Sequence, residues 1–183
     1  MLTGFKIRIH PNKEQISKFY QYAGTSRFMY NWSLNKIKEA YDLGIKFKDI
    51  KLSNQLTIIQ KEIEDLKWLT TIPRKVKCIA IEDCEESFKR FFREQSKYPK
   101  FKSKKKSKLS FSFHYTCGDV TNVPKAGKVK LNPKDKLTEK VSNSHIATRL
   151  NISFDGKYWY ISGAYEKEYE LVELTESSLG IDL

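Results

Sequence analysis

The stretch FKIRIHPNKEQ, residues 5–15, places a strand signal immediately before a helix signal. In its first half, apolar residues at every second position flank the basic residues Lys6 and Arg8. This alternation is typical of a half-buried strand, and it predicts that the outer face of the strand is basic. A single strand needs partners, so we expect strands much further along the chain to pair with it.

Helical periodicity follows this strand. Asn12 and Gln15 have the spacing of a capping box, which predicts a helix start. Apolar residues recur at helical spacing before and after Gly24, which predicts two packed helices. A third helix is expected over residues 52–66, and Pro73 is expected to open a fourth. We therefore expect a four-helix unit.

The apolar period changes to two after the helices. Residues 109–115 alternate, a shorter strand covers 129–131, and the longest alternation runs over 146–154. Asp155-Gly156 is a strong hairpin signal, and residues 158–165 form the expected return strand. The economical architecture is α+β, a β domain interrupted by a helical insertion.

The amino-acid composition limits the classes of function that this chain can have. The 183 residues contain 34 Lys and Arg against 22 Asp and Glu, a net charge of +12 that attracts a polyanion such as nucleic acid. We find no apolar run long enough for a membrane span and no signal-peptide core, so a soluble, cytoplasmic, nucleoid-associated protein is expected. The three cysteines, Cys78, Cys84 and Cys117, form no CxxC pair, and no structural metal is expected.

The segment from Arg93 to Lys108, hereafter the basic segment, contains seven lysines interleaved with aromatic residues. Close lysines repel one another unless something neutralises them, and aromatic rings offer stacking surfaces for bases. Two interpretations stay open, a nucleic-acid contact and a solvated linker whose lysines serve solubility.

Several stretches, in this order along nearly the whole chain, resemble the TnpB (OrfB) family of transposon-encoded RNA-guided DNA nucleases, which is related to compact type V CRISPR effectors. The matching stretches are residues 5–15, 24–31, 68–69, 88–92, 98–105, 155–160 and 180–183.

The resemblance implies a wedge domain, an oligonucleotide-binding-like β-barrel split over residues 1–10 and 109–178. A helical recognition lobe, residues 11–108, is then inserted after its first strand, and residues 179–183 begin a RuvC-type nuclease domain. The implied partners are a guide RNA and double-stranded target DNA next to a short transposon-adjacent motif. The alternatives are a non-catalytic DNA-binding regulator of the same family and an inactive transposon remnant.

The resemblance also implies candidate binding residues. The helix after Pro73 would face the adjacent-motif DNA, where Arg74 suits a guanine edge or a phosphate, while Cys78 suits a thymine methyl or simply the core. Arg27 and Asn31 suit either binding or a corner held by hydrogen bonds. The full set of nucleic-acid candidates is Lys6, Arg8, Arg74, Lys75, Cys78, Lys97, Tyr98, Lys100, Lys102, Lys104, Lys105 and Thr116.

Asp182, in the closing Gly180-Ile181-Asp182-Leu183, matches the first metal-binding carboxylate of the family's nuclease domain. One carboxylate cannot build a magnesium site, and the further acidic residues of that domain are absent from this sequence. The chain as given is therefore expected to hold no cofactor and not to cleave DNA, and Mg²⁺ is expected only with a complete nuclease domain. It is either the N-terminal part of a longer nuclease or a truncated relative.

Overall fold

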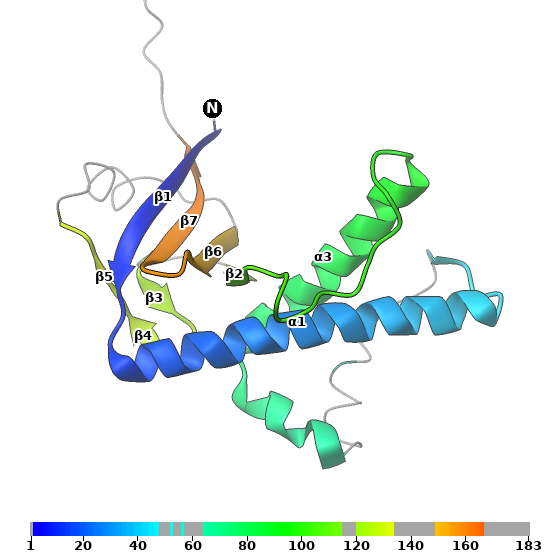
Figure 1. Ribbon diagram of the computed structural model, residues 1–183, viewed down its shortest axis with the longest axis horizontal. Coiled ribbons are helices and arrows are strands. Elements are labelled where there is room, and N and C mark those ends of the chain that lie inside the picture. The colour runs from blue at the N-terminus through cyan, green and yellow to red at the C-terminus, as the bar shows by residue number, and fades with distance from the viewer. Residues whose placement is uncertain are drawn as a thin grey trace, which may run out of the picture.

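The computed structural model describes residues 2–47, 52, 56, 64–114, 120–133 and 149–166, and it is α+β, as the sequence predicts (Figure 1). A five-stranded antiparallel sheet has the order β2-β6-β7-β1-β5, and a small β3-β4 hairpin lies beside it. The elements are β1 (Leu2–His10), α1 (Lys13–Asp42), the 3-10 helix η2 (Glu64–Thr71), α3 (Arg74–Phe92), β2 (Leu109–His114), β3 (Asn122–Val123), β4 (Gly127–Lys128), β5 (Lys130–Leu131), β6 (Arg149–Phe154) and β7 (Trp159–Glu166).

The first strand finds its partners near the other end of the sequence. β1 pairs with β7 along its length, with Ile7 opposite Ile161, and with β5 at its C-terminal end. Its apolar residues are buried, while Lys6 is exposed and Arg8 half-buried. The predicted strand with a basic outer face is therefore confirmed.

The hairpin between β6 and β7 lies where it was predicted, but Phe154 pairs with Trp159, so the loop contains the four residues 155–158 and not the predicted two. Gly156 has a φ of +104°, a backbone conformation that glycine adopts without a steric cost. One carboxylate oxygen of Asp155 accepts hydrogen bonds from the backbone N–H groups of Lys157 at 2.8 Å and Tyr158 at 2.7 Å. These bonds favour the ionised form and hold the pKa of Asp155 below its usual value.

Helix α1 is one unbroken helix of 30 residues, so the predicted break at Gly24 is wrong. Its start is confirmed, because Asn12 and Gln15 form both hydrogen bonds of a capping box. A glycine inside a helix costs only about 1 kcal/mol relative to alanine. Ala23 and Thr25 on either side of Gly24 are buried, and their packing outweighs that cost.

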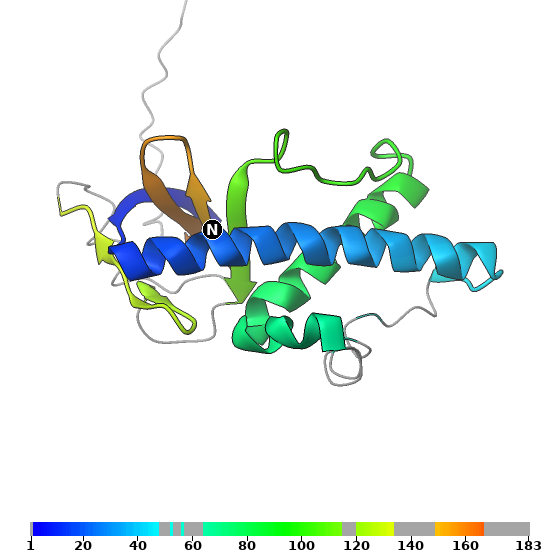
Figure 2. The ribbon, with the colours of Figure 1, turned by 60° about the horizontal axis from the view of Figure 1, so that its bottom comes forward.

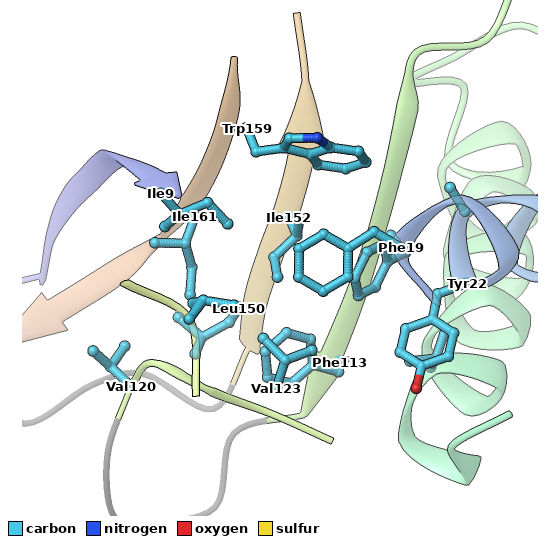
Figure 3. Close-up of a cluster of buried hydrophobic side chains, with 14 of the residues drawn as sticks. Ile9, Phe19, Tyr22, Phe113, Val120, Val123, Leu150, Ile152, Trp159 and Ile161 are labelled. Atoms are coloured by element: carbon cyan, nitrogen blue, oxygen red, sulfur yellow. The ribbon is translucent and has the colours of Figure 1, made fainter. Parts of the chain in front are cut away.

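Two hydrophobic cores meet along α1. The N-terminal half of α1 packs Phe19 and Tyr22 against the sheet, on the side that carries Ile152 and Trp159 (Figure 3). Both rings also contact Phe111. The C-terminal half contributes to a second core, with residues of η2 and α3 and with Leu52 and Leu56. The buried members of this second core are Met29, Tyr30, Leu34, Ile37, Leu52, Leu56, Leu69, Ala80, Ile81, Cys84 and Phe88. Helix α1 therefore connects the sheet to the helical part (Figure 2).

Helix α3 begins directly after Pro73, as predicted, and buries Val76, Ala80, Cys84 and Phe88 on one face. The helices with described bounds are α1, η2 and α3, Leu52 and Leu56 are also helical, and most of the predicted helix over residues 52–66 lies outside the described residues. Strands β2 and β5 lie at the edges of the main sheet. The closed barrel and the four-helix lobe stay predictions. In the part of the chain that the structure describes, no helix is long and apolar enough to cross a bilayer.

Candidate nucleic-acid interface

The outer face of the sheet carries in-register rows of polar side chains. Alternation places the core residues of each strand on one face and their neighbours on the other. Pairing brings Ser153 on β6 opposite Tyr160 on β7, and Tyr160 opposite Arg8 on β1. A second row contains Ser162 and Lys6 in the same way. The outer face is therefore hydrophilic across the centre of the sheet.

Two cations on this face lie against tyrosine rings. The Nζ atom of Lys6 lies 4.4 Å from the ring centroid of Tyr160, and the guanidinium carbon of Arg8 lies 3.5 Å from that of Tyr158. The Nε atom of Arg8 is buried without a hydrogen-bond partner among the described residues. Cations held on aromatic rings beside solvent can contact phosphates, and the rings can stack on bases.

The basic segment runs from the end of α3 back alongside α1 to β2 (Figure 2). Asn31 on α1 fixes its middle, because its side chain donates to the carbonyl of Lys102 at 2.9 Å and accepts from the N–H of Lys102 at 2.8 Å. Asn31 therefore forms hydrogen bonds with backbone groups, as one of the two interpretations predicted. Its partner is the backbone of the basic segment, and not a corner between two helices. The predicted corner does not exist.

The lysines of the basic segment are not equivalent. Lys97, Lys100, Lys104 and Lys105 are exposed. Lys102 is also exposed as a whole residue, but its amino group lies 3.8 Å from the ring centroid of Tyr30. Burial of that amino group lowers the pKa of Lys102, and the nearby carboxylate of Asp83 partly offsets the shift.

Aromatic residues anchor the start of the basic segment. Tyr98 contacts Phe88 and Phe91 edge to face, at centroid distances of 5.6 and 5.2 Å. The Nζ atom of Lys38 lies between Tyr98 and Phe101, 5.7 and 5.0 Å from their centroids. Tyr98 and Phe101 still expose 43% and 53% of their surfaces, enough for a further ring to stack.

The candidates at the start of α3 lie at the opposite end of this helix from the start of the basic segment, whose last residues return to a cavity that Ile79 and Ala80 also line. Arg74 is exposed, and Lys75 and Cys78 are half-buried, so Cys78 is not a fully buried core residue. The basic segment begins at the opposite end of this 19-residue helix, about 28 Å away at 1.5 Å per residue. Lys6 and Arg8 lie on a third region, the outer face of the sheet. Thr116 and Asp182 lie outside the described residues.

Lys77, beside Cys78, is a buried cation that the sequence did not single out. It is 3% exposed, and its Nζ donates to the carbonyl of Leu69 at the end of η2 at 2.6 Å. Burial, followed by the nearby charge of Lys125, lowers the pKa of Lys77 to about 8. Lys125 donates to the carbonyls of Thr70 and Thr71, so both lysines cap the end of η2.

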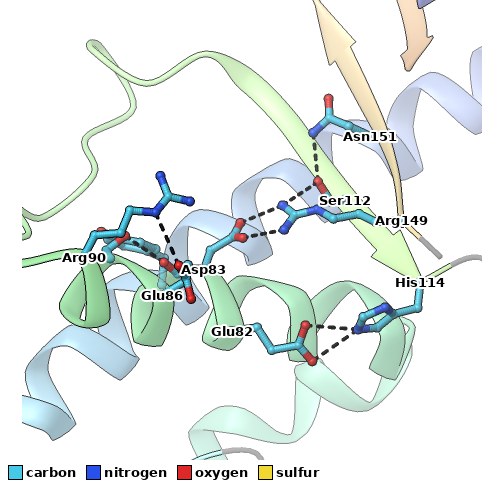
Figure 4. Close-up of polar contacts among 10 residues, drawn as sticks. Glu82, Asp83, Glu86, Arg90, Ser112, His114, Arg149 and Asn151 are labelled. Carbon is cyan, nitrogen blue, oxygen red and sulfur yellow. Dashed lines mark hydrogen bonds and ion pairs between the residues drawn. The ribbon is translucent and has the colours of Figure 1, made fainter. Parts of the chain in front are cut away.

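A polar network joins the sheet to α3, and sequence reasoning missed it (Figure 4). Arg149 on β6 forms two hydrogen bonds with the carboxylate of Asp83, at 2.7 and 3.0 Å, and a third with Ser112 on β2. His114 contacts Glu82 at 3.1 Å. The alternation of Ser112 and His114 with apolar residues was visible in the sequence, but it does not reveal partners on α3.

Replacing Asn31 with alanine is expected to release the basic segment from α1. Removing both hydrogen bonds to Lys102 costs on the order of 1 kcal/mol locally, which raises the open population several-fold. Limited trypsin digestion should then cut after the lysines of the basic segment several-fold faster. Asn35→Ala is the matched control, because the Asn35 side chain on the same helix donates to the exposed Glu39 side chain. Equal cleavage rates in the two variants would contradict the anchoring role.

Comparisons with known proteins agree with the resemblance seen in the sequence. A helix-turn-helix domain family, named for OrfB of the IS605 type, matches residues 1–46. Within these residues the structure describes β1 and the unbroken α1, so the turn in that description has no counterpart here.

Two curated relatives match nearly all of this chain. One is named as a candidate RNA-guided DNA endonuclease, InsQ, of Escherichia coli strain K12, and is 26% identical over 189 residues, covering 99% of this chain and 45% of the relative. The other, named as a candidate RNA-guided DNA endonuclease of Streptomyces pristinaespiralis, is 26% identical over 185 residues, covering 97% and 45%. The chain therefore spans about half the length of these relatives.

Among solved structures, a cryo-EM structure of a Cas12f1-sgRNA-target DNA complex aligns with 92% of this chain and 49% of that chain, at 13% identity and a TM-score of 0.41. A score this low does not by itself define the fold. The sequence matches confirm the resemblance to the TnpB (OrfB) family.

Proposed function

We propose that this chain is the nucleic-acid-binding part of a TnpB-like RNA-guided DNA endonuclease. The observation that carries the proposal is the outer face of the sheet, where Lys6 and Arg8 lie against Tyr160 and Tyr158. This face combines the two features that single-stranded nucleic acid requires, cations for phosphates and rings for bases. The names of the two curated relatives supply independent support.

In this proposal the sheet belongs to a split, oligonucleotide-binding-like β-barrel, and the helices belong to a recognition lobe. The outer face of the sheet and the exposed lysines Lys97, Lys100, Lys104 and Lys105 contact phosphates of the guide RNA, with Tyr98 available for stacking. These contacts are independent of sequence, so they fix the position of the nucleic acid without reading it.

The start of α3 contacts double-stranded DNA in the same proposal. Arg74 and Lys75 provide positive charge at a helix start that has no acidic residue in its first turn. Arg74 can bond a guanine edge or a phosphate, and Cys78, one turn later, can contact a thymine methyl. Thr116 adds a hydroxyl contact. In a complete nuclease domain, Asp182 is one of several carboxylates that hold Mg²⁺ for cleavage.

The experiment compares binding of the purified chain to structured RNA transcribed from its own locus and to unrelated RNA of the same length. We expect tighter binding of the first RNA and strong salt dependence for both. Equal affinity for the two RNAs would overturn the guide-RNA proposal. Sequence-specific binding of duplex DNA without any RNA would instead favour a non-catalytic regulator.

A further inference from the structure

A cavity of about 270 Å³ lies at the seam where β2 and β6, α1, α3 and the basic segment meet. We call it the seam cavity. Its sheet residues Ser110, Ser112 and Asn151 lie on the outer face, at the β2-β6 end of the rows that contain Tyr160 and Lys6. Its polar lining includes Ser26 and Arg27 from α1, Asp83 from α3, Lys102 and Lys108 from the basic segment, and Arg149 from β6.

The lining of the seam cavity is strongly cationic. Four of its side chains are Arg or Lys, against the single carboxylate of Asp83. That carboxylate is already bonded by both terminal nitrogens of Arg149. No described carboxylate lies within ion-pair distance of Arg27, Lys102 or Lys108. Neighbouring cations around one hollow repel one another, and an anion inside would relieve that repulsion.

A hydroxyl group in the same lining has no partner. Ser26 Oγ is buried and makes no hydrogen bond to any described residue. Other hydroxyls on α1 bond back to the carbonyl four residues earlier, as Thr25 does to Gln21 and Ser33 to Met29, both at 2.9 Å. Ser26 does not, and a buried hydroxyl without a partner is costly. Because Ser26 lines the cavity, an acceptor there can satisfy this O–H once the side chain turns toward it.

We propose that the seam cavity binds one phosphate group, held by the charges of Arg27, Lys102 and Lys108 and by a hydrogen bond from Ser26. A phosphate group fits this donor set because it carries negative charge and several acceptor oxygens. Arginine and lysine around a shared anion are a common arrangement for phosphate recognition. Bound there, the phosphate connects the basic segment to α1 and β6.

The nucleic-acid source of this phosphate rests on the proposed function, whereas the preference of the cavity for a phosphate group does not. A phosphate in the chain of a nucleic acid and a phosphate at its 5′ end share the same chemistry. Lys102 lines the cavity, and its amino group lies 3.8 Å from the ring centroid of Tyr30. A nearby anion would raise the pKa of Lys102 again by favouring its charged form.

The test uses the full chain and two double variants of equal charge. Arg27→Gln with Lys108→Gln removes two cations from the seam cavity. Lys13→Gln with Lys46→Gln removes two exposed cations that lie outside both the seam cavity and the proposed interface. Inorganic phosphate is the first probe, and thermal unfolding in phosphate is compared with chloride at matched ionic strength. We expect phosphate to raise the Tm of the wild type and of the exposed-lysine control, and to have little effect on the seam variant.

RNA is the second probe. We expect the seam variant to lose at least about tenfold more RNA affinity than the control, because it loses charge-assisted hydrogen bonds and not only screened charge. Tighter binding of 5′-phosphorylated RNA than of the same RNA with a 5′-hydroxyl would assign the site to a terminal phosphate. Equal binding of the two RNAs would assign it to an internal phosphate.

Circular dichroism checks that each variant folds, and Lys108→Gln alone serves if the double seam variant does not fold. Arg27→Lys keeps the charge and should retain most of the phosphate effect.

An equal Tm response to phosphate in the seam variant and the control, or none in the wild type, would overturn the proposal. If the seam variant and the control both bind RNA as tightly as the wild type does, the seam site is contradicted and the proposed function is not. If the wild type binds phosphate but no RNA, the proposed function is contradicted and the phosphate site is not.

Discussion

Replacing Phe19 with alanine is expected to lower the free energy of unfolding by about 3–5 kcal/mol. Phe19 on α1 is fully buried and lies edge-on to Trp159 on β7, with ring centroids 5.2 Å apart. It also contacts Phe111 on β2 at 5.4 Å. The substitution removes the ring that joins the helix to two strands of the sheet, and it leaves a cavity that rigid neighbours cannot fill.

Urea denaturation followed by circular dichroism measures this loss. Tyr41→Ala on the same helix is the control, because Tyr41 is 76% exposed, and it should change the stability by no more than about 0.5 kcal/mol. A loss for Phe19→Ala no larger than that of the control would mean that α1 does not pack on the sheet as described.

Replacing four lysines of the basic segment with glutamine is expected to cause the largest loss of RNA affinity among the variants considered. Each phosphate contact contributes about 0.7 to the slope of log affinity against log salt for single strands, so four contacts account for a slope change of about 3. Thermal stability should fall only slightly, through loss of the contact between Lys102 and the Tyr30 ring, because the other three lysines are exposed and contribute little to folding. The substituted residues are Lys100, Lys102, Lys104 and Lys105.

Fluorescence anisotropy at several salt concentrations measures both the affinity and the slope. A control variant with the same loss of charge takes four lysines from other parts of the surface, so that it reports the effect of net charge alone. If both variants show the same slope, the basic segment is a solvated linker. The control residues are Lys13, Lys36, Lys46 and Lys130.

The elements with local signals were predictable from the sequence. The alternation around Lys6 and Arg8 defined β1, the spacing of Asn12 and Gln15 defined the start of α1, and Asp155-Gly156 defined the β6-β7 turn. Each signal is contained within a few neighbouring residues, where backbone geometry and side-chain chemistry act together.

The prediction of a break at Gly24 was wrong because it rested on the low helix propensity of glycine and ignored the packing of the neighbouring residues. The buried positions of α1 continue in phase from Tyr22 to Met29 across the glycine, since one helix packs on two cores. Only the tertiary structure shows that the second core begins where the first ends. Local propensity is a weak guide when packing on both sides favours continuity.

The seam between sheet and helices could not be predicted from one sequence. Arg149 and Asp83 are 66 residues apart, and Asn31 and Lys102 are 71 residues apart. Neither pair has a spacing that marks it as a contact. The basic segment itself was visible from composition, but its attachment to α1 and the different environment of Lys102 required the structure.

UV cross-linking of bound RNA, with the attached peptides mapped by mass spectrometry, tests the proposed interface most directly. Aromatic side chains stacked on bases cross-link efficiently, so we expect attachment at Tyr158 or Tyr160 on the outer face of the sheet and at Tyr98 in the basic segment. Cross-links confined to η2 or to the β3-β4 hairpin, with none in these two regions, would contradict it.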